Sequence, residues 1–108
     1  MVFHDLSRPR IAHGTVTLSS RAVALALAHL YDPVALLTRH LSGDWGALPL
    51  HYALLNENWL YLKMRVYSRY EIGGANVIFV TTDLTARRTT FICENENALL
   101  AKLSSSWL

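Results

Sequence analysis

The side chains that could carry chemistry in this 108-residue sequence fall into two groups. The first is "RHLSGDWG" at 39–46, where His40 and Asp44 would form a charge pair at the end of a helix, facing a cleft. The second begins at Arg65 and continues through hydroxyl residues in later strands. An arginine on phosphate, a histidine that titrates near neutral pH and hydroxyls that position a ribose are what a metal-independent ribonuclease needs. The candidate catalytic residues are His40, Arg65, Ser68 and Tyr70, with His51 as a second possible histidine.

The same residues also have a structural interpretation, which we favour. Gly43 is placed to end a helix in a left-handed conformation, and Asp44 can accept amide hydrogen bonds in the next turn. Trp45 would then fill the core, and Gly46 would allow close backbone approach. In the second group, strand alternation places Arg65 on the face opposite Ser68 and Tyr70, so a single site would need a bulge.

A nucleic-acid surface is a third interpretation. Arg65, Tyr67 and Arg69 share one strand face, and Arg87 and Arg88 open a neighbouring strand. Basic residues interleaved with an aromatic side chain can contact phosphates and stack on bases. A net charge of only +2 predicts modest affinity. The candidate binding residues across these interpretations are Asp44, Trp45, Asn56, Arg69, Thr82, Thr89 and Thr90.

Other kinds of site find little support in the sequence. The five histidines lack metal-ligand spacing, and we expect neither a metal nor a cofactor. Cys93 lies in an apolar segment that predicts a small core residue, and a single cysteine allows no internal disulfide. The most apolar run, at 22–28, is far too short to span a membrane, and no signal peptide is evident. These features together predict a cytoplasmic protein.

The elements that must position these residues follow from periodicity and capping. Asp32 and Pro33 are typical of a helix start, and Gly73 and Gly74 supply the positive φ angles of a tight hairpin. The predicted strands span 14–19, 65–72, 76–82 and 88–94; the predicted helices span 21–30, 33–41, about 49–63 and, briefly, 95–103, capped by Asn95 or Asn97.

This order predicts an α+β domain. An N-terminal strand and two to three helices pack on one face of a C-terminal three-stranded antiparallel meander, followed by a short C-terminal helix. A single domain would span 1–108, with an ordered core at about 11–104. We expect the helix at 21–30 to be well buried. In the helix at about 49–63 we expect Leu50, Leu54, Leu55 and Trp59 to point inward, although "WLYLKM" at 59–64 is also compatible with a strand.

The pattern resembles a family of small, uncharacterised proteins of bacterial plasmids and integrating elements. The residues that carry the resemblance are "RHLSGDWG" at 39–46, Asn56, "RVYSRY" at 65–70, Thr82, Thr89 and Thr90, within a span from about Gly14 to Glu94. The family brings no established activity. It usually has an acidic residue at Tyr52, an aspartate-arginine-serine turn at Thr85 to Arg87 and a proline at Glu94. An activity that depends on those positions would be lost or changed here.

We therefore expect a small cytoplasmic accessory or binding protein of mobile-element type, without catalysis. The alternative is the toxin-like ribonuclease, with His40 as acid and base and Arg65 on phosphate. A protein or a nucleic acid is the expected kind of partner, and no membrane is involved. The chain would be a monomer or a weak homodimer, the latter formed through its apolar excess or through the tail "SSSWL" at 104–108.

Overall fold

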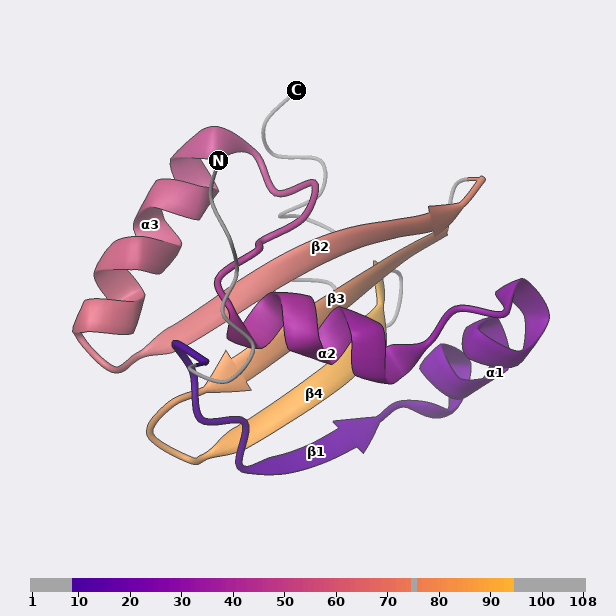
Figure 1. Ribbon diagram of the computed structural model, residues 1–108, viewed down its shortest axis with the longest axis horizontal. Helices are drawn as coiled ribbons and strands as arrows, with labels where there is room; N and C mark the ends of the chain where they lie inside the picture. The colour runs from indigo at the N-terminus through magenta and orange to yellow at the C-terminus, as the bar shows by residue number, and fades with distance from the viewer. Residues whose placement is uncertain (1–8, 75, 95–108) are drawn as a thin grey trace.

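The computed structural model describes residues 9–74 and 76–94, which form three helices and one four-stranded sheet (Figure 1). In chain order the elements are β1 (Thr15–Leu18), α1 (Ser20–His29), α2 (Pro33–Leu41), α3 (Leu50–Tyr61), β2 (Arg65–Gly73), β3 (Asn76–Asp83) and β4 (Arg88–Cys93). The α+β class is confirmed. The helix expected at 95–103 and the tail at 104–108 lie outside the described residues.

The sheet is mixed, with strand order β1-β4-β3-β2. The meander of β2, β3 and β4 is antiparallel as predicted, with Arg65 opposite Asp83 and Asp83 opposite Arg88. The N-terminal strand β1 instead pairs parallel to β4, with Thr15 opposite Arg88. Parallel pairing needs a long crossover connection, and here the three helices and two strands between β1 and β4 provide it.

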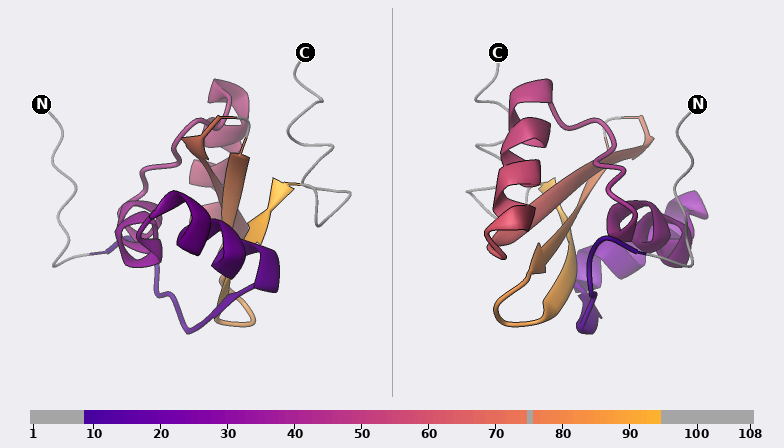
Figure 2. Two further views of the ribbon diagram at one scale, coloured as in Figure 1. Left: turned by 90° about the vertical axis from the view of Figure 1, so that its right-hand side faces the viewer. Right: turned by 60° about the vertical axis from the view of Figure 1, so that its left-hand side comes forward.

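Helices α1 and α2 cover one face of the sheet, which faces the viewer in Figure 1 and is called the front face here; both views in Figure 2 show this arrangement. The main core lies beneath them. It contains Ala22, Leu36, Tyr70, Ile78, Val80, Phe91 and Cys93, all buried. Helix α3 lies along β2 at the edge of the sheet, beside a second cluster formed around Ile11, Trp45 and Val66.

Local signals set the ends of α2 as predicted. The Asp32 side chain accepts a hydrogen bond from the Val34 amide at 2.9 Å, and Pro33 occupies the first helical position. The helix ends at Leu41, and Gly43 follows with a φ of +88°. For α1 the capping residue is Ser19, so the helix begins at Ser20, one residue before the predicted start at 21.

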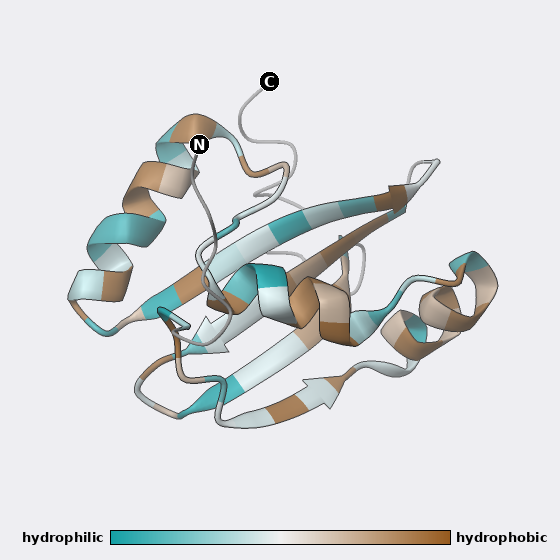
Figure 3. Cartoon of the chain, in the orientation of Figure 1, coloured by the Kyte–Doolittle hydropathy of each residue, from teal (hydrophilic) through white to brown (hydrophobic). Residues whose placement is uncertain are grey.

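Two expectations about helix burial are wrong. In α1 only Ala22 is buried, and Leu27 is 76% exposed. This helix is apolar over most of its surface (Figure 3), but only one side meets the sheet. In α3 the fully buried residue is Asn56, and Leu50, Leu54 and Leu55 are exposed; of the four residues expected to point inward, Trp59 does so and packs against the second cluster. Apolar residues surround α3 on all sides, so periodicity did not indicate the face that packs on β2.

The "GDWG" loop closes the outer edge of β2. The Arg69 amide donates to the Trp45 carbonyl at 3.0 Å, and the Arg69 carbonyl accepts from the Ala47 amide at 2.7 Å. Gly46 lies between these two bonds with a φ of +69°, and a Cβ atom there would lie 2.3 Å from the Arg69 oxygen. The glycine is therefore required both by its backbone conformation and by the close approach of two chains. Unpaired strand edges invite wrong pairing, and this loop removes that hazard at β2.

No single helix in the described part is long and apolar enough to cross a membrane. Helices α1 and α2 satisfy the length and hydropathy of a span only when taken together, and they are bent by 112°.

We expect Gly46→Ala to lower the free energy of unfolding by about 1–3 kcal/mol more than Gly74→Ala, because the new methyl group must push the two chains apart. Gly74 is a matched control: its φ of +56° is similar, and nothing lies within 4 Å of a Cβ atom there. Urea denaturation of both variants measures the difference. Equal losses would show that backbone conformation alone explains the glycine.

Candidate functional site

A histidine at the centre of the core connects helix α2 to three strands and, through them, to the segment before β1. His40, which is fully buried, is 2.6 Å from the Ser68 hydroxyl through Nδ1 and 2.8 Å from the Thr82 hydroxyl through Nε2. The Thr82 and Thr89 hydroxyls are 2.8 Å apart, and Thr89 donates to the His13 carbonyl at 2.7 Å. The chain of hydrogen bonds therefore runs from β2 through α2 to β3, β4 and the segment before β1.

The direction of this chain is fixed by its last acceptor. The His13 carbonyl can only accept a hydrogen bond, so the Thr89 hydroxyl donates its proton to it. Thr89 must therefore accept the hydrogen bond from the Thr82 hydroxyl. Thr82 in turn accepts from His40 Nε2, which leaves Nδ1 as the acceptor for the Ser68 hydroxyl. His40 is thus a neutral imidazole protonated on Nε2, with both ring nitrogens satisfied.

Burial lowers the pKa of His40 to about 3, because the charged ring would lose its water without gaining an anion. The expected charge pair between His40 and Asp44 does not form. Asp44 pairs with Arg39 at 2.7 Å instead, and the indole of Trp45 lies edge-on to the His40 ring with centroids 5.9 Å apart. Trp45 is buried, as the structural interpretation predicts.

The four candidate catalytic residues do not share an accessible site. His40 and Ser68 are fully buried, and Tyr70 is buried with its hydroxyl donating to the Asp44 carbonyl at 2.6 Å. Desolvation raises the pKa of Tyr70 well above its ordinary value. Arg65 lies on the opposite face of β2, as alternation predicts, and pairs with Asp83 at 2.9 Å. No bulge brings Arg65 to the other three, since the register between Arg65 and Glu71 is regular.

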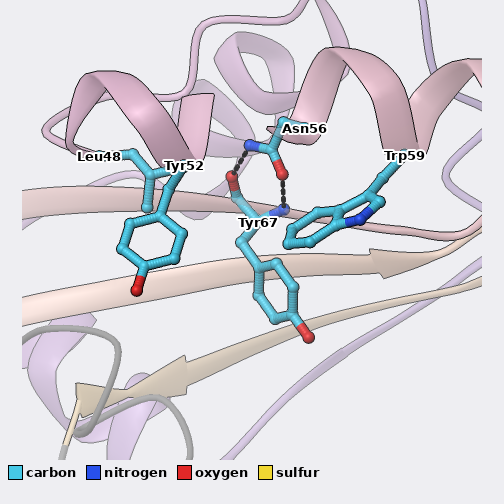
Figure 4. Close-up of a pocket in the computed structure, with 5 residues that line it drawn as sticks. All are labelled: Leu48, Tyr52, Asn56, Trp59 and Tyr67. Carbon is cyan, nitrogen blue, oxygen red and sulfur yellow. Dashed lines mark hydrogen bonds between the residues drawn. The ribbon is translucent and has the colours of Figure 1, made fainter. Parts of the chain in front are cut away.

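Asn56 closes the same strand edge as the "GDWG" loop, one step further along (Figure 4). Its Nδ2 donates to the Tyr67 carbonyl at 2.6 Å, and its Oδ1 accepts from the Tyr67 amide at 3.1 Å. A side-chain amide therefore replaces a neighbouring strand. The surrounding cavity of about 10 Å³, also lined by Leu48, Tyr52 and Trp59, has room for about one water and none for a ligand.

The cations on the rear face of β2 are largely neutralised by their neighbours. Arg65 pairs with Asp83, and Arg69 pairs with Glu71 at 2.9 Å. The Tyr67 ring packs edge-on against Trp59, with centroids 6.1 Å apart. Thr90 lies on this face and contacts Thr17 through its hydroxyl at 3.4 Å. The face has the composition of a nucleic-acid surface, but the two arginines of β2 are paired with carboxylates. Exposed Arg88 on β4 is the cation of this face that forms no ion pair with the described residues.

An open groove lies at the end of the sheet where the β3–β4 turn meets the C-terminal end of α3. Its volume is about 520 Å³, within the range of ligand sites. Three segments that are distant in sequence line it, contributing Arg10, Ala12 and Gly14, then Leu60 and Lys63, then Leu84 and Arg87. Leu60 and Leu84 are half-buried and form its apolar floor, whereas the three exposed cations form its rim. We define the seven lining residues as the basic groove.

Two of the cations on the rim sit in strained backbone. Lys63 has a φ of +55° at the position after α3 where helices usually place glycine. The Lys63 amide donates to the Leu60 carbonyl and the Met64 amide donates to the Trp59 carbonyl, which completes a Schellman motif. Arg87 also has a φ of +55°, and its carbonyl accepts from the Thr15 amide at 3.1 Å.

The turn that carries Arg87 is held rigidly. Asp83 Oδ1 accepts from the Thr85 and Ala86 amides at 3.0 and 2.9 Å, and the Thr85 hydroxyl donates to the Lys63 carbonyl at 3.2 Å. The Ala86 amide and the Arg65 guanidinium hold the pKa of Asp83 below its ordinary value. The hydrogen bond from Thr85 to Lys63 therefore joins the turn that carries Arg87 to the end of α3.

Arg10, the third cation of the groove, is held by an ion pair with α3. It forms a bidentate pair with Glu57 at 2.6 and 3.0 Å, and Glu57 also accepts from the Trp45 indole at 3.0 Å. The hydrogen bond from Arg10 lowers the pKa of Glu57. Lys63 and Arg87 are exposed and form no ion pair with any residue in 9–74 or 76–94. The groove could not be predicted from the sequence, because a positive φ at lysine leaves no mark there.

The described residues contain no group of three or more histidine, cysteine, aspartate or glutamate side chains able to hold a metal ion. Cys93 is buried, as the apolar pattern around it predicts.

We expect the His40 ring to stay neutral from pH 8 to about pH 4, whereas an ordinary histidine titrates near 6.5. Below pH 6.5 the unfolded chain binds a proton that the folded ring refuses, so folding stability should fall by up to about 1.4 kcal/mol per pH unit toward pH 3. Ring chemical shifts of His40 in the folded protein measure the titration. A His40 midpoint above pH 5 would contradict the neutral core.

We expect Asn56→Ala to lower the free energy of unfolding by about 2–3 kcal/mol, because it strands the Tyr67 amide and carbonyl without partners. Asn58→Ala on the same helix is the matched control, since Asn58 is exposed. Chemical denaturation of the two variants distinguishes them. If both lose the same small amount, the Asn56 bonds are replaced by water and do not hold the edge.

No family model matches this sequence, and neither the curated proteins nor the solved structures contain a significant match. The resemblance to proteins of bacterial plasmids and integrating elements therefore stays a prediction, and the function has to be argued from the groove itself.

Proposed function

We propose that this protein is a small cytoplasmic binding or accessory protein of mobile-element type, without catalysis, that holds an acidic segment of a partner protein in the basic groove. The observation that carries the proposal is that Lys63 and Arg87, two exposed cations on the groove rim, both occupy left-handed backbone. A non-glycine residue costs about 1–2 kcal/mol in that conformation. Strain of this kind concentrates at functional sites, where the side chain is needed.

The chemistry of the groove favours a peptide over a nucleic acid. Leu60 and Leu84 offer an apolar floor, and none of the residues that line the groove has an aromatic ring on which a base could stack. Few cations surround it, and Arg10 already shares its charge with Glu57. A segment with carboxylates on either side of one apolar side chain matches this surface, because the carboxylates can pair with Lys63 and Arg87 while the apolar residue meets the floor.

The ribonuclease alternative lacks support at its central residue. General acid–base catalysis requires a group within hydrogen-bond reach of the substrate and a pKa near the working pH. His40 has no exposed surface, and its pKa is about 3. In this proposal His40 and the hydroxyl groups bonded to it have a structural role: they hold together the strands that position the groove.

The proposal is tested with a fluorescein-labelled peptide in which glutamate pairs flank one leucine, against its glutamine counterpart and a single-stranded RNA. We expect the glutamate peptide to bind most tightly and to weaken with salt. Lys63→Gly should weaken binding about tenfold while raising the free energy of unfolding by about 0.5–1 kcal/mol, because glycine relieves the strained backbone.

Arg21→Ala is the matched control, since it removes an exposed cation from α1, outside the groove. It should change peptide affinity about twofold or less, through net charge alone. The proposal is wrong if Lys63→Gly and Arg21→Ala act equally. It is also wrong if RNA binds more tightly than the peptide, which would favour a nucleic-acid partner.

A further inference from the structure

Strand β3 is buried on both faces of the sheet, although helices α1 and α2 cover only the front face. Alternate residues of β3 point into the main core, so Val77 and Phe79 point to the rear. Phe79 has no exposed surface, and Val77 is 6% exposed. Half-buried residues of β2 and β4 pack against these two side chains. We define the rear cluster as Val77, Phe79, Tyr67 and Ile92.

None of the three described helices lies across the rear cluster. Helices α1 and α2 are on the opposite face, and α3 runs along β2 at the edge of the sheet. Trp59 of α3 contacts the ring of Tyr67, at the border of the cluster. A sheet face that buries a phenylalanine has to pack against a second layer, because its apolar surface would otherwise meet water. The residues at 9–74 and 76–94 supply no helix for this layer.

We infer that the rear cluster is the docking site of the chain's own segment at 95–108, which packs across the rear of the sheet as an amphipathic helix. The place where this segment begins supports the inference. Strand β4 ends at Cys93, which pairs with Ile78, so the chain leaves the sheet between Val77 and Phe79 in register. The segment therefore starts beside the surface that needs covering.

The other undescribed end of the chain starts from the front of the molecule. The Arg10 amide donates to the Leu41 carbonyl at 2.8 Å, and Pro9 lies beside the same last turn of α2. Residues 1–8 would have to pass around an edge of the sheet to reach the rear cluster. The segment at 95–108 has no such detour to make.

The residues of the segment match the surface in pattern and in length. Leu99, Leu100 and Leu103 recur at i, i+1 and i+4, which places them on one face of a helix. A helix over 95–103 would be about 13 Å long. The step from β4 across β3 to β2 is about 10 Å. Such a helix therefore reaches from Ile92 to Tyr67.

The distribution of charge on the rear face also fits an apolar occupant at this end. Arg65, Asp83 and Arg88 are paired in register at the other end of the strands, beside the β3–β4 turn. The segment is also joined to β4, so its effective concentration at the cluster is of millimolar order. A separate partner would have to compete with that concentration to occupy the same surface.

The direct test is nuclear magnetic resonance of the full chain with its natural sequence. We expect nuclear Overhauser effects from the methyl groups of Leu99 and Leu103 to the Phe79 ring and the Ile92 methyl groups. Contacts of these leucines with Leu27 on α1 instead, or no contact with the rear cluster, would overturn the inference. Overhauser effects between labelled and unlabelled copies in a mixed sample would also overturn it, because a second molecule would then occupy the face.

Leu103→Asp measures what this packing contributes to stability. We expect it to lower the thermal midpoint of unfolding by about 5–10 °C, because a carboxylate would replace an apolar side chain against the rear cluster. Leu27→Asp is the matched control, since Leu27 is 76% exposed on α1. It should shift the midpoint by about 2 °C or less. Equal shifts would contradict the inference, and if Leu103→Asp fails to fold, the Overhauser effects of the natural chain decide.

Discussion

Burying the imidazole of His40 obliges the core to supply one donor and one acceptor to its ring, since an unsatisfied polar group in the interior is costly. The sheet meets this demand with hydroxyls at Ser68 and Thr82, and Thr89 passes the chain on to the His13 carbonyl. Helix α2, three strands and the segment before β1 are thereby fixed relative to one another. The "GDWG" loop can close the β2 edge only because this junction holds the end of α2 beside it.

Features that depend on neighbours in sequence could be predicted. Asp32 and Pro33 set the start of α2, and alternation placed Ser68 and Arg65 on opposite faces of β2. Features that depend on distant partners could not. Nothing local indicates that β1 pairs parallel to β4, or that only one side of α1 finds a sheet to cover. Residue types suggested a catalytic site around His40 because the sequence does not state whether a histidine faces water or the core.

The basic groove illustrates the same limit in another way. Its three lining segments are brought together by the β3–β4 turn and by the end of α3, and its strongest signal is a pair of backbone angles. Lys63 and Arg87 look ordinary in the sequence, as does Leu30. Each stands where glycine would relax the chain, so the fold gives up some stability at its surface. In its interior, every buried side-chain nitrogen and oxygen among the described residues has a hydrogen-bond partner.

The one-way order of hydroxyls around His40 has a consequence for how the molecule could diversify. Each side chain in this chain has a fixed role as hydrogen-bond donor, acceptor or both. A single substitution such as Thr82→Val would therefore leave both of its neighbours without a hydrogen-bond partner. Only paired replacements that keep its polarity, or wholesale conversion to hydrocarbon, would be tolerated. Homologous chains should therefore substitute these positions together, and the residues that covary would be those joined by the hydrogen bonds.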